Sequence, residues 1–220
     1  MKNPTMALAL MALSFCASSQ VMAEVETYNI DNAHSFANWS IRHVASKVSG
    51  TFSDVTGKLV IDRENLANSS VTAKINMLSV NSSHAKRDEH IKKPEYLDTA
   101  KFAEMTFVSS QVSAKNKSEG IITGNLTLHG VTKEIAFPFK VLGFGNDPWG
   151  GYRSGIEAHT LIKASDYGFT WAAKAGAPVG NDIEITLLIE GVKLPAAMVH
   201  AEKSVKLRTV LIYGLQYYVV

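Results

Sequence analysis

Residues 70–77 read Ser-Val-Thr-Ala-Lys-Ile-Asn-Met, so that an apolar side chain occupies every second position. Successive side chains of a β-strand point to opposite faces of the sheet, whereas a helix repeats its apolar face about every 3.6 residues. The stretch therefore predicts a strand with one buried and one solvated face. Residues 36–43 repeat the pattern, with Trp39, Ile41 and His43 on the same side.

The same alternation extends along most of the chain, and turn-forming residues separate the runs. Further strands are expected at residues 26–30, 52–61, 105–112, 121–128, 134–142, 155–163 and 182–192. A total of about eight or nine antiparallel strands is typical of a sandwich or a barrel. A closed barrel of about eight strands can enclose one small or slender ligand. Because no linker or repeat interrupts residues 24–193, we expect one domain there.

Residues 82–93 interrupt the strand pattern with a polar, helix-forming stretch that Pro94 ends. We expect one or two short helices here, with Ser82 and Ser83 as possible N-caps. The stretch mixes basic and acidic side chains, which usually indicates a solvated helix face with local ion pairs. The alternative is a cationic rim that binds an anionic head group at the mouth of a barrel.

The first 23 residues have the pattern of a secretory signal peptide. Lys2 provides the positive start, residues 6–15 form an uncharged apolar run, and Val21-Met22-Ala23 suits cleavage after Ala23. The run is shorter than the roughly 20 residues of a membrane span. Cys16 is the one cysteine and lies in this segment, so the mature chain would have neither thiol chemistry nor a disulfide. These features predict export to a compartment such as the bacterial periplasm.

Residues 194–220 follow the last predicted strand and differ from the rest of the chain. Pro195-Ala196-Ala197 breaks the alternation, and basic residues then precede an apolar, tyrosine-containing run at 210–220. We interpret this extension as an appended strand or a loosely docked tail. The alternative is an interfacial membrane anchor, which would combine the basic and the aromatic side chains.

Composition and charge exclude several classes of protein. With 46% apolar and 19% charged residues, the chain is not disordered, collagenous or a coiled coil. A formal net charge of +2 supplies no basic field for a nucleic acid. The sequence has no Gly-x-Ser-x-Gly elbow, no glycine-rich phosphate loop and no histidine pair at metal-ligand spacing. We therefore expect no metal and no cofactor.

His43 has the clearest context among the histidines, because it shares the predicted inner face with Trp39 and Ile41. It is either a hydrogen-bonded histidine of a packed core or a polar contact inside an apolar cavity. An acid–base role for His43, or for His34 in the turn after Asp31, would make the protein an enzyme that acts on a hydrophobic substrate.

Several short motifs occur in a combination that is more specific than any one of them. They are Asp31-x-x-His34-Ser35, Trp39-x-Ile41-x-His43, Gly50-Thr51-Phe52, Gly57, Arg87-Asp88-x-His90, Phe102-x-x-Met105-Thr106-Phe107, Gly124-Asn125-Leu126-Thr127-Leu128-His129-Gly130-Val131-Thr132-Lys133, Ser165-Asp166-Tyr167-Gly168 and Val179-Gly180-Asn181-Asp182. Across residues 25–193 the chain thereby resembles the YceI-like family of exported proteins. Lys163 departs from the arginine expected there, and residues 194–220 have no counterpart in the family pattern.

The resemblance implies a lipocalin-like antiparallel barrel that holds a polyisoprenoid chain or an isoprenoid quinone. Members are typically periplasmic and are viewed as carriers or sequestering proteins, not as enzymes. We accordingly predict a periplasmic lipid-binding protein that acts in transport, storage or sequestration without catalysis. Its partners would be an isoprenoid lipid and, transiently, a membrane, with no nucleic acid; the sequence identifies no protein partner. The alternatives are the enzyme described above and an envelope interaction module.

The predicted ligand contacts are of two kinds. The apolar tube would be lined by Trp39, Ile41, Phe52, Leu59, Ile75, Phe107, Leu126, Phe137 and Phe139. The polar or head-group candidates are His43, Arg87, His90 and Lys92. The same apolar residues would also fill an ordinary packed core, so the periodicity predicts an apolar interior, and only the resemblance implies that it is hollow.

Mature protein isolated from the envelope of an expressing bacterium should begin at Glu24, because cleavage after Ala23 removes the signal peptide. Loss of 23 of the 220 residues leaves a chain of 197 residues. Intact-mass spectrometry and N-terminal sequencing measure the mass and the first residue. An envelope fraction that contains only chains starting at Met1 would contradict this prediction.

Overall fold

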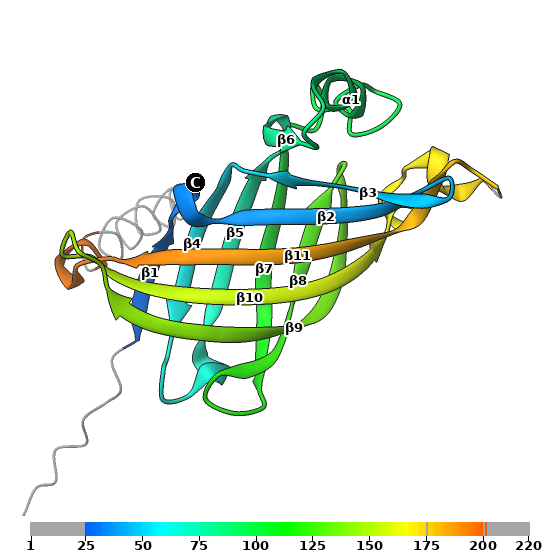
Figure 1. Ribbon diagram of the computed structural model, residues 1–220. Coiled ribbons are helices and arrows are strands. Elements are labelled where there is room, and N and C mark those ends of the chain that lie inside the picture. Colours follow the sequence, from blue (N-terminus) through cyan, green and yellow to red (C-terminus); the bar gives the residue numbers. More distant parts are fainter. Residues whose placement is uncertain (1–24, 175, 200, 202–220) are drawn as a thin grey trace, which may run out of the picture.

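The computed structural model describes residues 25–174, 176–199 and 201 of the chain. Long antiparallel strands wrap into a barrel, and the helix α1 lies beyond the barrel wall at one end (Figure 1). The strands are β1 (Glu26–Ile30), β2 (Phe36–His43), β3 (Ser46–Phe52), β4 (Val55–Ile61), β5 (Ser70–Asn76), β6 (Val80–Asn81), β7 (Glu104–Ala114), β8 (Glu119–Leu128), β9 (Val131–Asn146), β10 (Tyr152–Lys163) and β11 (Val179–Lys193). The helices are α1 (Ala85–Ile91) and the short 3-10 helices η1 (Asn32–His34), η2 (Leu66–Asn68), η3 (Met77–Ser79), η4 (Ala164–Tyr167) and η5 (Thr170–Ala173).

Eight of these strands close the barrel, in the order β1-β4-β5-β7-β8-β9-β10-β11. The sheet closes where β1 pairs with β11, with Tyr28 opposite Lys193. Every neighbouring pair in the closed sheet is antiparallel. The predicted fold, a single antiparallel β-barrel of about eight strands with short inserted helices, is therefore confirmed.

Three further strands extend the sheet from β11. β1 pairs with the C-terminal end of β11, whereas β2 pairs with residues 179–188 of the same strand, and η1 turns the chain between β1 and β2. β3 and β6 continue the sheet beyond β2. The described residues thus contain more strands than the eight or nine that the sequence predicts, because β3 and β6 were not expected; the run predicted at 52–61 is divided, with Phe52 at the end of β3 and β4 beginning at Val55.

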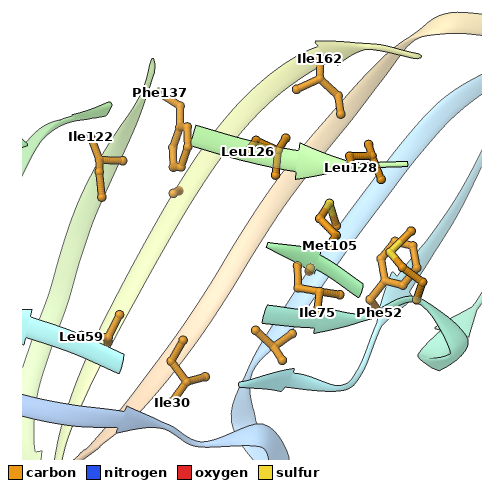
Figure 2. Packing of buried hydrophobic residues seen from close by; sticks show 14 of the residues in the cluster. Ile30, Phe52, Leu59, Ile75, Met105, Ile122, Leu126, Leu128, Phe137 and Ile162 are labelled. Atoms are coloured by element: carbon orange, nitrogen blue, oxygen red, sulfur yellow. The ribbon is translucent and has the colours of Figure 1, made fainter. Parts of the chain in front are cut away.

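The strand register brings the alternating apolar positions together on the inside. Ala73 lies opposite Phe107, Ile75 lies opposite Met105, and Phe107 lies opposite Leu126 on its other side. Since side chains alternate between the two faces of a strand, each strand contributes every second residue to the common interior. Figure 2 shows Ile75, Met105 and Leu126 pointing into this interior, together with Ile162 from β10.

The helix predicted before the proline is shorter than expected and begins differently. α1 spans Ala85–Ile91, and its N-cap is His84, whose Nδ1 accepts a backbone N–H from the first turn at 3.2 Å. Ser82 and Ser83 were the predicted caps, and that prediction is wrong. The hydroxyl and the N–H of Ser82 both bind the Asp88 carboxylate instead, so Ser82 joins the helix to the preceding strand.

The two ends of the chain lie largely outside the described residues. The predicted signal peptide at 1–23 falls entirely outside them, as do residues 200 and 202–220 of the C-terminal extension. Of that extension, residues 196–199 form a helical turn after Pro195, and the apolar run at 210–220, where an appended strand or docked tail is expected, lies outside the described residues. Within the described ranges, each helix is too short or too polar to cross a membrane.

An ion-pair network joins the β1–β2 corner to β11 and to the β9–β10 turn. The Arg153 guanidinium donates to Glu190 Oε1 at 2.6 Å, to Asp147 Oδ2 at 2.7 Å and also to Asp31 Oδ2. His34 Nδ1 lies 2.9 Å from Asp31 Oδ2. The hydrogen bond with His34, aided by the one with Arg153, lowers the pKa of Asp31 to about 2. The folded state therefore stabilises the ionised form of this carboxyl group.

Asp31 should make the free energy of unfolding depend on pH in acid. Its folded pKa of about 2 lies below the unfolded value of roughly 3.9, so the carboxylate stabilises the fold above about pH 4. This contribution, at most about 2 kcal/mol, is lost as the pH falls from 4 toward 2. Urea titrations should show a smaller pH dependence over this range for Asp31→Asn. If the free energy of unfolding changed equally with pH in the wild type and in Asp31→Asn, Asp31 would not be the source of the pH dependence.

Candidate ligand cavity

The barrel encloses a cavity of about 450 Å³. Ligand pockets in proteins commonly measure about 300–1,000 Å³, so this volume suits a small or slender molecule. The wall is almost wholly aliphatic and aromatic, and it draws on strands around the barrel and on the α1 and η5 segments. Among the side chains in Figure 2, Ile30, Leu59 and Ile122 reach the cavity from β1, β4 and β8.

All nine apolar residues that the sequence assigned to a tube line this cavity. They come from β2, β3, β4, β5, β7, β8 and β9, and they are Trp39, Ile41, Phe52, Leu59, Ile75, Phe107, Leu126, Phe137 and Phe139. Phe107 and Phe137 pack against each other with ring centroids 5.3 Å apart. Contact between these side chains and a ligand remains a prediction.

Glycines on neighbouring strands let three aromatic side chains lie flat against the wall. A Cβ atom built on Gly124 would come within 2.6 Å of the Phe107 ring, and one on Gly120 within 2.9 Å of the Phe139 ring. A Cβ atom built on Gly50 would likewise clash with the indole ring of Trp39. Each ring thus covers a glycine instead of crossing the lumen. Sequence reasoning noted Gly50 and Gly124 only as parts of motifs and missed this role.

One end of the barrel, here called the α1 end, is where β2 ends, β11 begins and α1 and η5 lie. Among the four head-group candidates, His43 at the end of β2 and His90 on α1 are exposed and line the cavity. Arg87 lines it as well. Lys92 is not part of the lining, and its Nζ binds Glu89 Oε1 at 2.9 Å. The α1 segment therefore brings two of its three head-group candidates, Arg87 and His90, to the cavity wall.

An aromatic cluster that sequence reasoning missed borders the cavity at the α1 end. The ring centroids of His90 and Tyr96 lie 4.8 Å apart, those of Tyr96 and Trp171 6.0 Å, and those of Trp171 and Phe169 5.6 Å. These contacts connect the α1 segment with η5. Periodicity gives no signal for these residues, because they lie in short helices and loops. The nearest signal was the family motif that ends at Gly168.

Two indole N–H groups in the cavity lining have no hydrogen-bond partner among the described residues. Trp39 Nε1 and Trp171 Nε1 are both shielded from solvent. Leaving a buried donor without an acceptor costs about 1–3 kcal/mol. Both donors are therefore packed against protein atoms without a compensating acceptor among the described residues.

The two histidines considered for acid–base chemistry lie in different places. His34 is exposed and lies outside the cavity lining, where its ring and the Asp31 and Glu190 carboxylates come within 4.8 Å of one another. The Arg153 guanidinium binds both of these carboxylates, so the cluster has the composition of an ion-pair network. The His43 side chain lines the cavity but forms no hydrogen bond with a described residue. It therefore lacks the orienting partner found in most acid–base pairs.

Comparison with known proteins gives a consistent match over the barrel. The family model of the YceI-like domain matches residues 28–191. Protein YceI of Salmonella newport (strain SL254) is 40% identical over 196 residues, which cover 88% of this chain and 99% of the Salmonella chain.

Two solved structures share the fold at lower sequence identity. BcnA of Burkholderia cenocepacia superposes with a TM-score of 0.66 at 18% identity, covering 73% of this chain and 98% of BcnA. A polyisoprenoid binding domain from Saccharophagus degradans, implicated in plant cell wall breakdown, has a TM-score of 0.58 at 18% identity, covering 76% of this chain and 98% of that domain. These likenesses show the barrel fold.

Filling the cavity should destabilise the protein less than overpacking a solid core. Ala158 on β10 is buried and lines the cavity, so a Phe ring there can extend into the open volume. Ala164 is fully buried but is not in the lining. Urea unfolding should show a loss below about 1 kcal/mol for Ala158→Phe and of about 1–3 kcal/mol for Ala164→Phe. Similar losses at the two positions would mean that β10 faces a packed core.

Proposed function

The chain belongs to the YceI-like domain family, and from that membership we propose that it is a non-catalytic lipid-binding protein of the periplasm. Its barrel encloses the hydrocarbon chain of one polyisoprenoid or isoprenoid quinone. The bound lipid is transported, stored or sequestered, and it is not chemically changed.

The observation that carries the proposal is the apolar cavity of about 450 Å³. A prenyl chain gains roughly 0.8 kcal/mol for each CH₂-sized group that leaves water, before the entropic cost of binding. A cavity that exists before the ligand arrives reduces that cost, because few side chains need to be ordered. The Saccharophagus domain of the same fold is described as polyisoprenoid binding, which supports this ligand class.

The polar groups at the α1 end suit the head of such a lipid. His43, Arg87 and His90 line the cavity there, while the remaining wall is almost entirely apolar. A ligand with its chain in the tube and its head at the α1 end would match both parts of the lining. Lys92 lies outside the lining and would act only at the rim.

The surroundings of the histidines favour binding over catalysis. His43 has no orienting partner among the described residues, and His34 lies outside the cavity. The family and the fold are those of binding proteins. The periplasmic location is proposed from the signal-peptide pattern of residues 1–23.

Protein purified without detergent from the export compartment should release a bound isoprenoid into organic solvent, to be identified by mass spectrometry. Ile41→Asp should abolish retention of the lipid, because an ionised carboxylate in the apolar tube has lost its hydration and gains no partner. Leu161→Asp is the matched control. It makes the same chemical change on the outer face of β10, where Leu161 is 55% exposed, and should retain the lipid.

Circular dichroism and urea unfolding establish that both variants are folded before their extracts are compared. If Ile41→Asp does not fold, Ala158→Phe reduces the same cavity and should lower the amount of bound lipid. A folded wild type with an empty extract that also fails to take up added isoprenoids would refute the proposed function.

A further inference from the structure

Four exposed basic side chains at the α1 end lie apart from any carboxylate in the described part of the chain. Lys86 and Lys93 belong to the α1 segment, where they line one shallow hollow on the surface. Arg42 lies near the end of β2, and Lys174 directly follows η5. These four residues are here called the mouth cations. Basic side chains that are not neutralised by a neighbour raise the positive potential of the surface around them.

The mouth cations lie on two sides of the cavity mouth, the place where the exposed side chains of His43 and His90 line the cavity. On the β2 side, the Arg42 guanidinium donates to the Ala177 carbonyl at 2.8 Å, three residues after Lys174. A carbonyl group leaves the positive charge uncompensated. Figure 1 shows the turn between β2 and β3 next to the segment that follows β10. The other two cations come from the α1 segment, which also carries His90.

The acidic side chains of the α1 segment do not cancel these charges. Three of them have other neighbours: Asp88 binds Ser82, Glu89 binds Lys92, and Glu95 Oε1 lies 3.9 Å from His90 Nε2. The fourth, Asp98, is half-buried and has no partner among the described residues. Four exposed cations therefore stand against Asp98 and, where His90 is neutral, Glu95. An excess of positive charge remains around the mouth.

The opposite end of the barrel is arranged differently. Arg63, Lys115, Lys117, Arg153 and Lys193 each have a side-chain nitrogen within 4 Å of a carboxylate oxygen. Ion pairs of this kind leave little net field at a distance. An anionic surface should therefore attract the α1 end of the molecule first and orient the barrel as it approaches.

An exposed valine projects from the turn between β2 and β3, beside Arg42. Val44 is 62% exposed, and its backbone φ is 50°, a left-handed conformation that is rare for a β-branched residue. Its N–H donates to the Pro178 carbonyl at 2.6 Å, which fixes the turn. The turn thus holds an apolar side chain outward although glycine or asparagine would adopt this backbone more easily. An apolar group among cations suits a bilayer interface, where phosphates lie next to hydrocarbon.

We propose that the α1 end docks on a bilayer that contains anionic phospholipid. The mouth cations lie at the level of the lipid phosphates, and Val44 enters the interfacial layer beneath them. Docking turns the cavity mouth toward the membrane, so a lipid can pass between bilayer and barrel without crossing water. This last step rests on the proposed function, whereas the docking itself depends only on the surface of the α1 end.

Sedimentation with vesicles tests the docking of the mature protein. Vesicles of phosphatidylcholine and phosphatidylglycerol in a two-to-one ratio should bind it at least about tenfold more tightly than phosphatidylcholine alone. The difference should shrink as salt is added, because exposed charges are screened. Lys86→Gln combined with Lys93→Gln should lower binding by at least about tenfold, since each basic side chain near an anionic surface contributes about fivefold.

Two charge-matched controls locate the docking surface. Lys115→Gln with Lys117→Gln removes the same charge from the β7–β8 turn and should bind as the wild type does. Gln at positions 203, 206 and 208 of the full chain removes the basic residues of the C-terminal extension and should preserve the preference for phosphatidylglycerol. A preference that is lost in either control and kept in the Lys86 and Lys93 variant overturns the proposal.

Val44→Asn tests the turn without endangering the fold. Asparagine adopts the left-handed conformation more readily than valine, so urea unfolding should show equal or greater stability. Binding to the phosphatidylglycerol vesicles should nevertheless fall about threefold, because the interface loses an apolar contact. Unchanged binding would remove Val44 from the docking surface.

Site-specific labelling measures the orientation. The mature chain expected after cleavage has no cysteine, so Ala45→Cys in the β2–β3 turn and Ala114→Cys at the end of β7 each provide one site for an environment-sensitive dye. With phosphatidylglycerol vesicles, the emission of the dye at position 45 should shift to the blue, and that at position 114 should not. The reverse result would show that the opposite end meets the membrane.

Failure of this inference can be distinguished from failure of the proposed function. If the protein yields a bound isoprenoid on extraction but does not distinguish the two kinds of vesicle, the docking is refuted and the lipid-binding barrel is not. If the extract is empty and added isoprenoids are refused, while vesicle binding still depends on Lys86 and Lys93, the docking surface is supported and the proposed function is refuted.

Discussion

The hydrogen bonds that close the sheet between β1 and β11 are the constraint on which the interior depends. A closed sheet has no free edges, and the number and tilt of its strands set its circumference. Two separate sheets can approach each other until their side chains fill the space between them. A closed barrel cannot, because its backbone holds the opposite walls apart. Closure therefore sets the width of the interior, and the side chains decide whether it is filled; here the rings of Trp39, Phe107 and Phe139 lie against glycines on neighbouring strands and leave a cavity.

The two ends of this barrel are held by different interactions. Arg153 lies near the start of β10 and binds three carboxylates, so ion pairs join the strands at that end. η4 and η5 follow the end of β10, where Lys163 on β10 binds Asp182 on β11 and the Tyr96 ring of the α1 segment packs against Trp171. Ion pairs are directional, whereas ring contacts tolerate sliding and tilting.

The strands were predictable because one physical rule, alternation, connects sequence to side-chain direction. That rule places Trp39, Ile41 and Phe107 on the inner face. No such rule covers Tyr96, Phe169 and Trp171, whose directions depend on the path of irregular backbone, so sequence reasoning missed them. Ser82 was misjudged for another reason: its preference for an N-cap lost to a tertiary hydrogen bond with a carboxylate six residues away. Alternation also could not separate a hollow interior from a packed one, since both use the same residues.

The glycines beneath Trp39, Phe107 and Phe139 determine the calibre of the tube although their own atoms contribute so little to its surface. A methyl group at Gly124 would press the Phe107 ring toward the axis, and a smaller residue in place of the ring would widen the bore. The second change leaves the backbone of the closed sheet untouched, whereas the methyl group would also meet the Val108 carbonyl oxygen of β7 at 2.5 Å. Single substitutions at these positions can thus change the width of the molecules that such a barrel admits. It can do so separately from the chemistry that recognises their heads.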